Sequence, residues 1–275
     1  MLRHYGTAPG LKKSVFTVFT LFLLITAYGQ GQSGTKGNKP PSPPGKGGRS
    51  DNHTPNPHGM IRNGERVATL LTPTGWGNTG KFGFVTTGGT PNQLYGSKPD
   101  MVIRIGVGIG DYRKIASLVA ILNINDASKL KNYSYSFIAS RSLGKWGSLS
   151  AGALHLFRDR VISDGASSWY LAWSRDFNKF GYTLGAGTGN FATRSPYDVE
   201  AGMSRRATAL FGSLTYKPVR NWMVAAEWTG SNLAATTSYV LPKKWPVIYF
   251  GVTDLTRYSG DSPTFVFGVG KVVKM

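Results

Sequence analysis

Four side chains whose types could do chemistry stand in or beside segments of alternating residues: Arg104, His155, Glu227 and Asp254. Arg104 and Glu227 share the parity of small or polar neighbours, so both are expected to point into the interior of the structure that those segments form. Asp254 is expected to join them near a segment end, although its neighbours of the same parity are apolar. A buried ion without a partner is costly. Opposite charges on one interior face therefore either brace the wall or line a watery path that selects a solute.

His155 has the parity of Leu149, Ala151 and Ala153, which predicts an outward orientation near a surface rim. A histidine beside a serine nucleophile and a polar group that orients the ring would resemble the site of a surface lipid hydrolase. No Gly-x-Ser-x-Gly or other nucleophile setting stands out in the chain. A hydrogen-bonding role at the rim is the simpler expectation, and we predict no catalytic residue and no enzymatic activity.

Neither a metal nor a cofactor is expected. The chain has no cysteine, and its other histidines, His4, His53 and His58, lack the spacing of metal ligands. The glycine-rich runs 106–110 and 185–189 resemble phosphate loops only superficially, because no helical pattern follows either run.

A period of two residues identifies the elements that must position these side chains. From Met101 to Gly110 every odd position is a sizeable apolar residue, while most even positions are glycine or charged. A strand places these two sets on opposite faces. The same alternation, with turn residues between, predicts twelve strands near 80–87, 100–109, 114–124, 132–142, 147–157, 168–175, 180–190, 206–216, 221–229, 234–241, 246–254 and 264–274.

The lengths of the connections favour a membrane barrel over a soluble β-domain. Links after the even-numbered strands are expected to be short, as at 143–146 and 176–179, and most of the others longer, as at 158–167 and 191–205. Outer-membrane barrels have short periplasmic turns and longer external loops. The sequence therefore predicts an all-β fold, an antiparallel transmembrane β-barrel of about twelve strands with a disordered N-terminal tail.

The chain ahead of the barrel has the composition of a leader and a spacer. Residues 1–29 combine a basic start, an apolar run and small residues before a cleavage position, as in a signal peptide. Residues 30–58 are rich in proline and glycine, with almost nothing to bury, which predicts a disordered tether. We assign residues 59–275 to the barrel and expect the tail in the periplasm of a bacterial outer membrane.

The net charge of +19 does not indicate a nucleic-acid partner. Lysine and arginine lie largely in turns, as at 111–114 and 217–220, and no recognition helix collects them. Basic rims that face anionic headgroups explain the charge more simply. The expected partners are outer-membrane lipid or lipopolysaccharide and, for the basic tail, cell-wall polymer or polysaccharide.

Several stretches resemble blocks of uncharacterised bacterial outer-membrane barrels that are distantly similar to the YjbH group. The resemblance covers about residues 72–275 and is carried by Thr74–Gly77, Gly106–Asp111, Leu154–Arg158, Gly185–Phe191, Glu227–Leu233 and Gly251–Leu255. It implies membership of an outer-membrane barrel family that is distantly similar to the YjbH group, which is linked to exopolysaccharide secretion, but it carries no function and assigns no active-site residue.

Three functions remain open from the sequence. The first is a passive channel or envelope-export component, which would admit anionic or neutral solutes because the barrel region is basic. The second is a closed structural or assembly barrel, with glycine-tight packing and an Arg104–Glu227 brace in its lumen. The third is a surface lipid hydrolase that uses His155.

Overall fold

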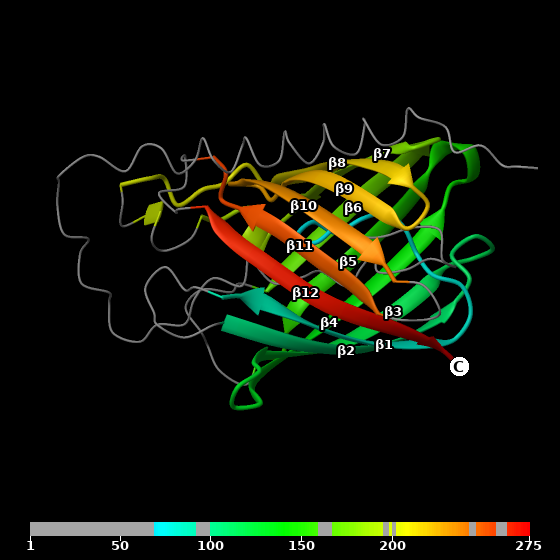
Figure 1. Ribbon diagram of the computed structural model, residues 1–275, viewed down its shortest axis with the longest axis horizontal. Helices are drawn as coiled ribbons and strands as arrows, with labels where there is room; N and C mark the ends of the chain where they lie inside the picture. Colours follow the sequence, from blue (N-terminus) through cyan, green and yellow to red (C-terminus); the bar gives the residue numbers. More distant parts are fainter. Residues whose placement is uncertain are drawn as a thin grey trace, which may run out of the picture. The chain divides into compact units, whose positions relative to one another are not determined.

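The computed structural model describes residues 69–91, 100–158, 167–194, 198–199, 202–241, 246–256 and 263–275. The expected signal peptide and tether lie outside these ranges. The described chain forms twelve strands, shown in Figure 1: β1 Phe82–Thr90, β2 Asp100–Gly110, β3 Ser117–Asp126, β4 Lys131–Ser142, β5 Ser148–Leu156, β6 Ser168–Phe177, β7 Phe180–Gly187, β8 Leu210–Val219, β9 Trp222–Trp228, β10 Leu233–Val240, β11 Val247–Thr253 and β12 Thr264–Lys274.

The strands close into one barrel. Each strand pairs antiparallel with its neighbours in the chain, and β1 pairs with β12 to complete the ring. Closure pairs every strand on both sides and leaves no open edge, as a spanning sheet in lipid requires. The twelve-stranded antiparallel barrel predicted from the sequence is confirmed, with each strand boundary within four residues of its expected position.

The two faces of the wall differ as the alternation predicts. In β2 the odd-numbered Ile105, Val107 and Ile109 are about half exposed on the outer face, whereas Arg104 on the inner face is buried. In β4 the tyrosines and phenylalanine at 133, 135 and 137 point outward and the serines at 134 and 136 point inward. An outer face this apolar suits contact with lipid rather than water.

Inward glycines make room for aromatic side chains. A methyl group built on Gly106 would stand 2.2 Å from the ring of Phe84, and one on Gly185 would stand 2.2 Å from the ring of Phe211. The Phe211 ring stacks on Phe191 at 4.4 Å between centroids. Inner-face glycine therefore serves close packing, as the sequence predicts, and part of the lumen is a packed apolar core.

The barrel has two distinct ends. We call the end with the links after even-numbered strands, such as 178–179 and 220–221, the turn end; it also holds the start of β1 and the end of β12. The opposite end, which carries longer connections such as 157–167 and 188–209, is the loop end. No helix of the described ranges is long and apolar enough to cross a membrane.

The packing of Gly185 against Phe211 predicts that substitutions at these two positions affect the free energy of unfolding jointly. Gly185→Ala should lower the free energy of unfolding by about 1–3 kcal/mol, because the added methyl overpacks the ring. The measurement is urea unfolding in detergent, followed by tryptophan fluorescence. Ala186→Val, on the outer face of the same strand, is the control and should change stability little.

Phe211→Leu should relieve part of the cost of Gly185→Ala. The double variant is then less destabilised than the two single variants summed. Additive losses would show that the ring and the glycine do not constrain each other.

Candidate functional site

The chain that leads into β1 lies inside the barrel. Residues Thr69–Lys81, which we call the lumen segment, hydrogen-bond to inward side chains of β3, β5, β6 and β9. Its Leu70 belongs to the apolar core of the interior. The cyan trace ahead of β1 in Figure 1 follows its path. The segment therefore occupies space that would otherwise be lumen.

Glu227 holds the far end of this segment. Its side chain is completely buried. The backbone amide of Leu70 donates to Oε1 at 2.8 Å, and those of Leu71 and Thr72 donate to Oε2 at 2.9 and 2.8 Å. The hydroxyl of Thr72 donates to Oε2 at 3.0 Å, and Thr236 of β10 donates to Oε1. Five donors therefore surround one carboxylate, and charge-assisted hydrogen bonds of this kind are the strong ones.

Serines on the inner wall hold the rest of the segment. Ser150 donates to the carbonyl of Thr74 at 2.8 Å, and the amide of Gly75 donates to Ser174 Oγ at 2.7 Å. A methyl group on Gly75 would stand 2.1 Å from the carbonyl oxygen of Ser148. Only glycine fits this approach, so the segment is closely applied to the wall at this point.

Two of the wall residues that bond the segment, Ser174 and Glu227, belong to one polar row of the wall. The strand register places these inward residues side by side on neighbouring strands: Ser148, Ser174, Thr183, Ser213 and Glu227. The row begins near the turn end of β5 and finishes near the loop end of β9. The lumen segment runs beside this row, from Gly75 at Ser174 to Thr72 at Glu227. Ser174 and Glu227 of the row thus accept hydrogen bonds from the backbone of the segment, whereas the hydroxyls of Ser148 and Ser213 have no hydrogen-bond partner among the described residues.

The expected brace between Arg104 and Glu227 does not form. Both residues point inward and are buried, as predicted. The carboxylate of Glu227, however, bonds to the lumen segment and to Thr236, and no contact joins it to Arg104 in the described chain. Arg104 stands opposite Thr86 and Asn123 in the register, on another side of the barrel. The structure therefore places both residues in the lumen but does not bring them together.

Asp254 lies just after the end of β11, in a left-handed backbone conformation with φ of 57°. Its carboxylate accepts hydrogen bonds from Asn232 and, at 2.7 Å, from the hydroxyl of Thr253. By alternation Asp254 should point outward, as Phe250 and Val252 do. The left-handed backbone turns its side chain inward instead, so it is buried. Asp254 joins the connection after β9 to the end of β11, at the loop end of the barrel.

The prediction that His155 points outward is wrong. A β-bulge places Leu154 and His155 of β5 opposite Ser136 alone, because Tyr135 pairs with Leu156 and Phe137 pairs with Ala153. His155 has a φ of 56°, and its side chain is only 6% exposed. The extra residue reverses the parity of the strand. The side chain consequently faces the interior.

Inside, His155 belongs to a buried polar network. Its Nδ1 lies 3.0 Å from Ser134 Oγ, and its backbone amide donates to Ser136 Oγ at 3.2 Å. Asn123 donates to the same Ser136 hydroxyl at 3.0 Å, and Asn125 donates to Ser134 Oγ at 3.3 Å. The network ties β3, β4 and β5 together.

A histidine next to a serine has the spacing of a base and a nucleophile. Here both residues are buried on the inner wall, and no hydrogen bond to the second ring nitrogen occurs within the described ranges. The arrangement does not present a base to a lipid at the outer surface. The described residues also contain no group of His, Asp or Glu that could hold a metal ion.

Sequence reasoning missed two features of this interior. Residues 69–81 show no period that marks them as part of the interior, so nothing predicted that they lie within the wall. The partners of Glu227 are mainly backbone amides, which every sequence supplies. The sequence hinted at a polar partner inside the barrel only through the many serines and threonines on inward positions, because buried hydroxyls need hydrogen-bond partners.

Comparisons with known proteins find barrels of similar architecture. No family model matches the chain, and no curated protein matches it. A KdgM porin matches with a TM-score of 0.42 and 12% identity, over 70% of this chain and 99% of that chain. Outer membrane phospholipase A from Escherichia coli matches with a TM-score of 0.39 and 10% identity, over 70% of this chain and 90% of that chain.

The contacts of Glu227 predict how the lumen segment is held. Glu227→Gln keeps the shape but removes the charge and replaces one acceptor oxygen by a donor. The amides of Leu70, Leu71 and Thr72 should then exchange hydrogen for deuterium at least about tenfold faster, since bonds to a charged acceptor contribute about 1.5–3 kcal/mol each. Hydrogen exchange with mass spectrometry of the intact protein measures this.

Ser238→Ala is the matched control. Ser238 is a buried inward residue of β10, like Thr236, but makes no hydrogen bond to the lumen segment in the described chain. Its replacement should leave exchange at residues 70–72 unchanged. Equal exchange in Glu227→Gln and wild type would mean that the carboxylate does not hold the segment.

Proposed function

We propose that the protein is an outer-membrane channel that is closed, in this conformation, by its own lumen segment, with Glu227 as the latch. The observation that carries the proposal is the carboxylate of Glu227, which binds three consecutive backbone amides of residues 70–72. A barrel that only needed a filled interior could use wall side chains alone. Here a stretch of main chain that belongs to no strand occupies part of the interior.

Most of the lumen segment can leave without opening the barrel. Residues 69–77 precede both β1 and the bridge of Thr79 to Asp111, so their release breaks no strand pairing and leaves the ring closed. The wall behind it carries the polar row Ser148 to Glu227, which water can hydrate once the segment is gone. A segment held by hydrogen bonds over a hydratable wall has the properties expected of a plug.

The charge of the interior supports a preference for anions or neutral solutes. Arg104 points inward from the middle of β2. Five donors hold the Glu227 carboxylate while the segment is in place, and four of them leave with the segment. Lysine and arginine around the turn end add a positive approach to that mouth. Arg104 and the basic turn-end mouth favour an anion, and Glu227→Gln removes the carboxylate that opposes it once the segment leaves.

The proposal predicts that conductance depends on the latch. In planar bilayers, wild type should show rare or no openings, whereas Glu227→Gln and Gly75→Val should raise the open probability at least about tenfold. The first variant weakens the carboxylate contacts, and the second places a side chain where a single methyl already collides with the wall. Single-channel recording of the refolded protein gives the result.

Ala226→Leu serves as the control, because Ala226 is the outward neighbour of Glu227 on the same strand. It should behave as wild type. A heat-modifiable gel shift confirms that every variant has folded. Folded variants that never conduct would contradict a channel and support the closed structural barrel, the alternative favoured by the apolar core of the interior.

Arg104 should set the ion preference of the open form. In the Glu227→Gln background, Arg104→Gln should shift the reversal potential in a salt gradient toward cation permeation. The reason is that it removes a fixed positive charge from the lumen wall. Arg220→Gln, on the link between β8 and β9, should shift it less. If the two substitutions have the same effect, Arg104 does not face the conducting path.

The remaining expectations from the sequence stay predictions. A role in exopolysaccharide export follows only from the resemblance to the YjbH group. The inward orientation of His155 removes the basis for a surface lipid hydrolase.

The placement of residues 30–58 in the periplasm can be tested by labelling a cysteine introduced at Ser42 in intact and permeabilised cells. The test matters because a periplasmic tail is expected at the turn end of the barrel. Thr72, in contrast, lies beside Glu227, near the loop end of β9.

A further inference from the structure

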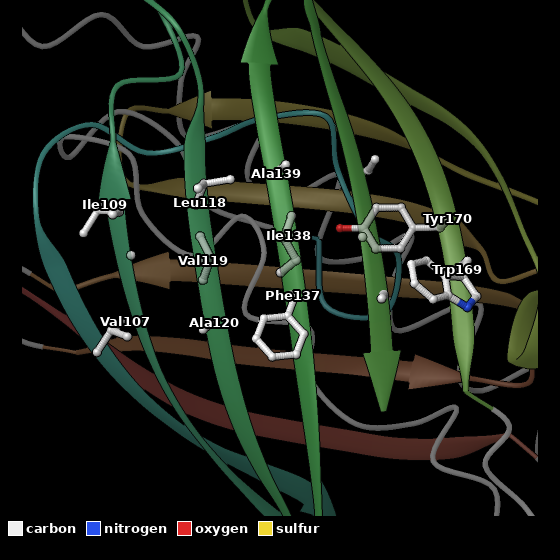
Figure 2. Close-up of a pocket in the computed structure, with 14 residues that line it drawn as sticks. Val107, Ile109, Leu118, Val119, Ala120, Phe137, Ile138, Ala139, Trp169 and Tyr170 are labelled. Carbon is white, nitrogen blue, oxygen red and sulfur yellow. The ribbon is translucent and has the colours of Figure 1, made fainter. Parts of the chain in front are cut away.

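The outer wall of β2 to β6 is hollowed into an apolar trough. It has a volume of about 540 Å³ and is lined almost entirely by carbon. Figure 2 shows side chains that line it, among them Ile109 of β2, Leu118 of β3, Phe137 of β4 and Trp169 of β6. All four of these side chains are exposed on the outer face of the barrel.

Alanines make the floor of the trough. The register aligns Leu118, Ala139, Ala151 and Leu171 in one row across the strands, and Ala120, Phe137, Ala153 and Trp169 in the next. Ala153 points outward yet is only 4% exposed, between the two aromatic residues. Small residues between tall ones therefore create a concave strip on a wall that faces lipid.

Basic side chains stand at the turn end of the trough. Arg141 is the next outward residue of β4 after Ala139, and it is exposed. Lys145 follows in the link to β5, where its ammonium lies 5.4 Å from the ring centre of Trp146. Arg113 and Lys114, on the link from β2 to β3, lie at the same end. The indole of Trp173 donates to the carbonyl of Trp146 at 2.7 Å, and tryptophans are enriched at the depth of membrane interfaces.

We infer that this trough binds one phospholipid with an anionic headgroup, its acyl chain over the alanines and its phosphate at Arg141. The inference rests on the proposed membrane placement and adds a ligand of defined chemistry to the outer wall. The phosphate would lie in the leaflet at the turn end of the barrel. An apolar trough that ends in cations at interfacial depth matches the two parts of such a lipid.

A second copy of the chain fits this surface less well. Partners in a membrane are related by an axis along the membrane normal, so a two-fold contact on the trough would bring the same basic rim of each copy together. Repulsion between these rims would oppose the contact. The concave floor would also face another concave floor and leave a void.

The experiment uses native mass spectrometry of the full chain in detergent with added phosphatidylglycerol. Wild type should retain one phosphatidylglycerol more tightly than phosphatidylcholine. Ala139→Leu with Ala151→Leu, which fills the trough, should weaken retention at least about tenfold. Arg141→Gln should weaken it about fivefold, since a basic residue at a lipid surface contributes about 1 kcal/mol.

Two controls match these variants. Ala226→Leu enlarges an outward alanine on β9, and Arg220→Gln removes a cation elsewhere at the turn end. Both should retain the lipid as wild type does. All variants must show the same heat-modifiable gel shift, so that loss of the lipid is not loss of the fold.

Equal retention in the trough variants and wild type would overturn the inference. So would equal retention of phosphatidylcholine, because the rim would then not recognise charge. A change from dimer to monomer in the trough variants, with lipid retention unchanged, would assign the surface to a second copy instead. The conductance of Glu227→Gln does not depend on the trough, so failure of the lipid site and failure of the channel proposal are separable.

Discussion

The interior of this barrel is organised around one buried carboxylate. Glu227 lies within a wall whose outer face meets lipid, so it can be charged only if donors surround it from within. Its own strand cannot supply them, because the amides of β9 are used in the sheet. The chain ahead of β1 supplies them instead, through three backbone amides and a hydroxyl. The position of the lumen segment inside the barrel follows from that requirement.

The alternation of the sequence predicts the strands of the wall well, because the orientation of each strand residue depends on its near neighbours in the chain. In β2 and β4 each residue faces either lipid or lumen, and the period of two survives in the residue types. The interior position of Arg104 and Glu227 could therefore be predicted. The link lengths predict the antiparallel order, and an even number of strands closes with both ends of the barrel chain on the same side. These properties depend on neighbours in the chain.

The contents of the barrel depend on contacts between distant parts of the chain, which the period does not carry. His155 illustrates this point, since one extra residue opposite Ser136 turned the histidine from the lipid to the lumen. Glu227 illustrates it again, because its partners lie 155 to 157 residues earlier and are mostly main chain. The brace between Arg104 and Glu227 was a reasonable expectation from charge alone. The register shows that their strands face different parts of the interior.

The interior combines two kinds of surface that behave differently if the lumen segment leaves. The aromatic residues seated over glycines, such as Phe84 over Gly106 and Phe211 over Gly185, belong to the strands and their loops and must stay. The row from Ser148 to Glu227 is polar, and it can exchange the backbone of the segment for water at modest cost. Had that row been apolar, departure of the segment would expose it to water and oppose opening. In the proposed gating, the serine, threonine and glutamate side chains on inward positions of β5 to β9 take up water when the segment leaves, while the aromatic packing preserves the wall.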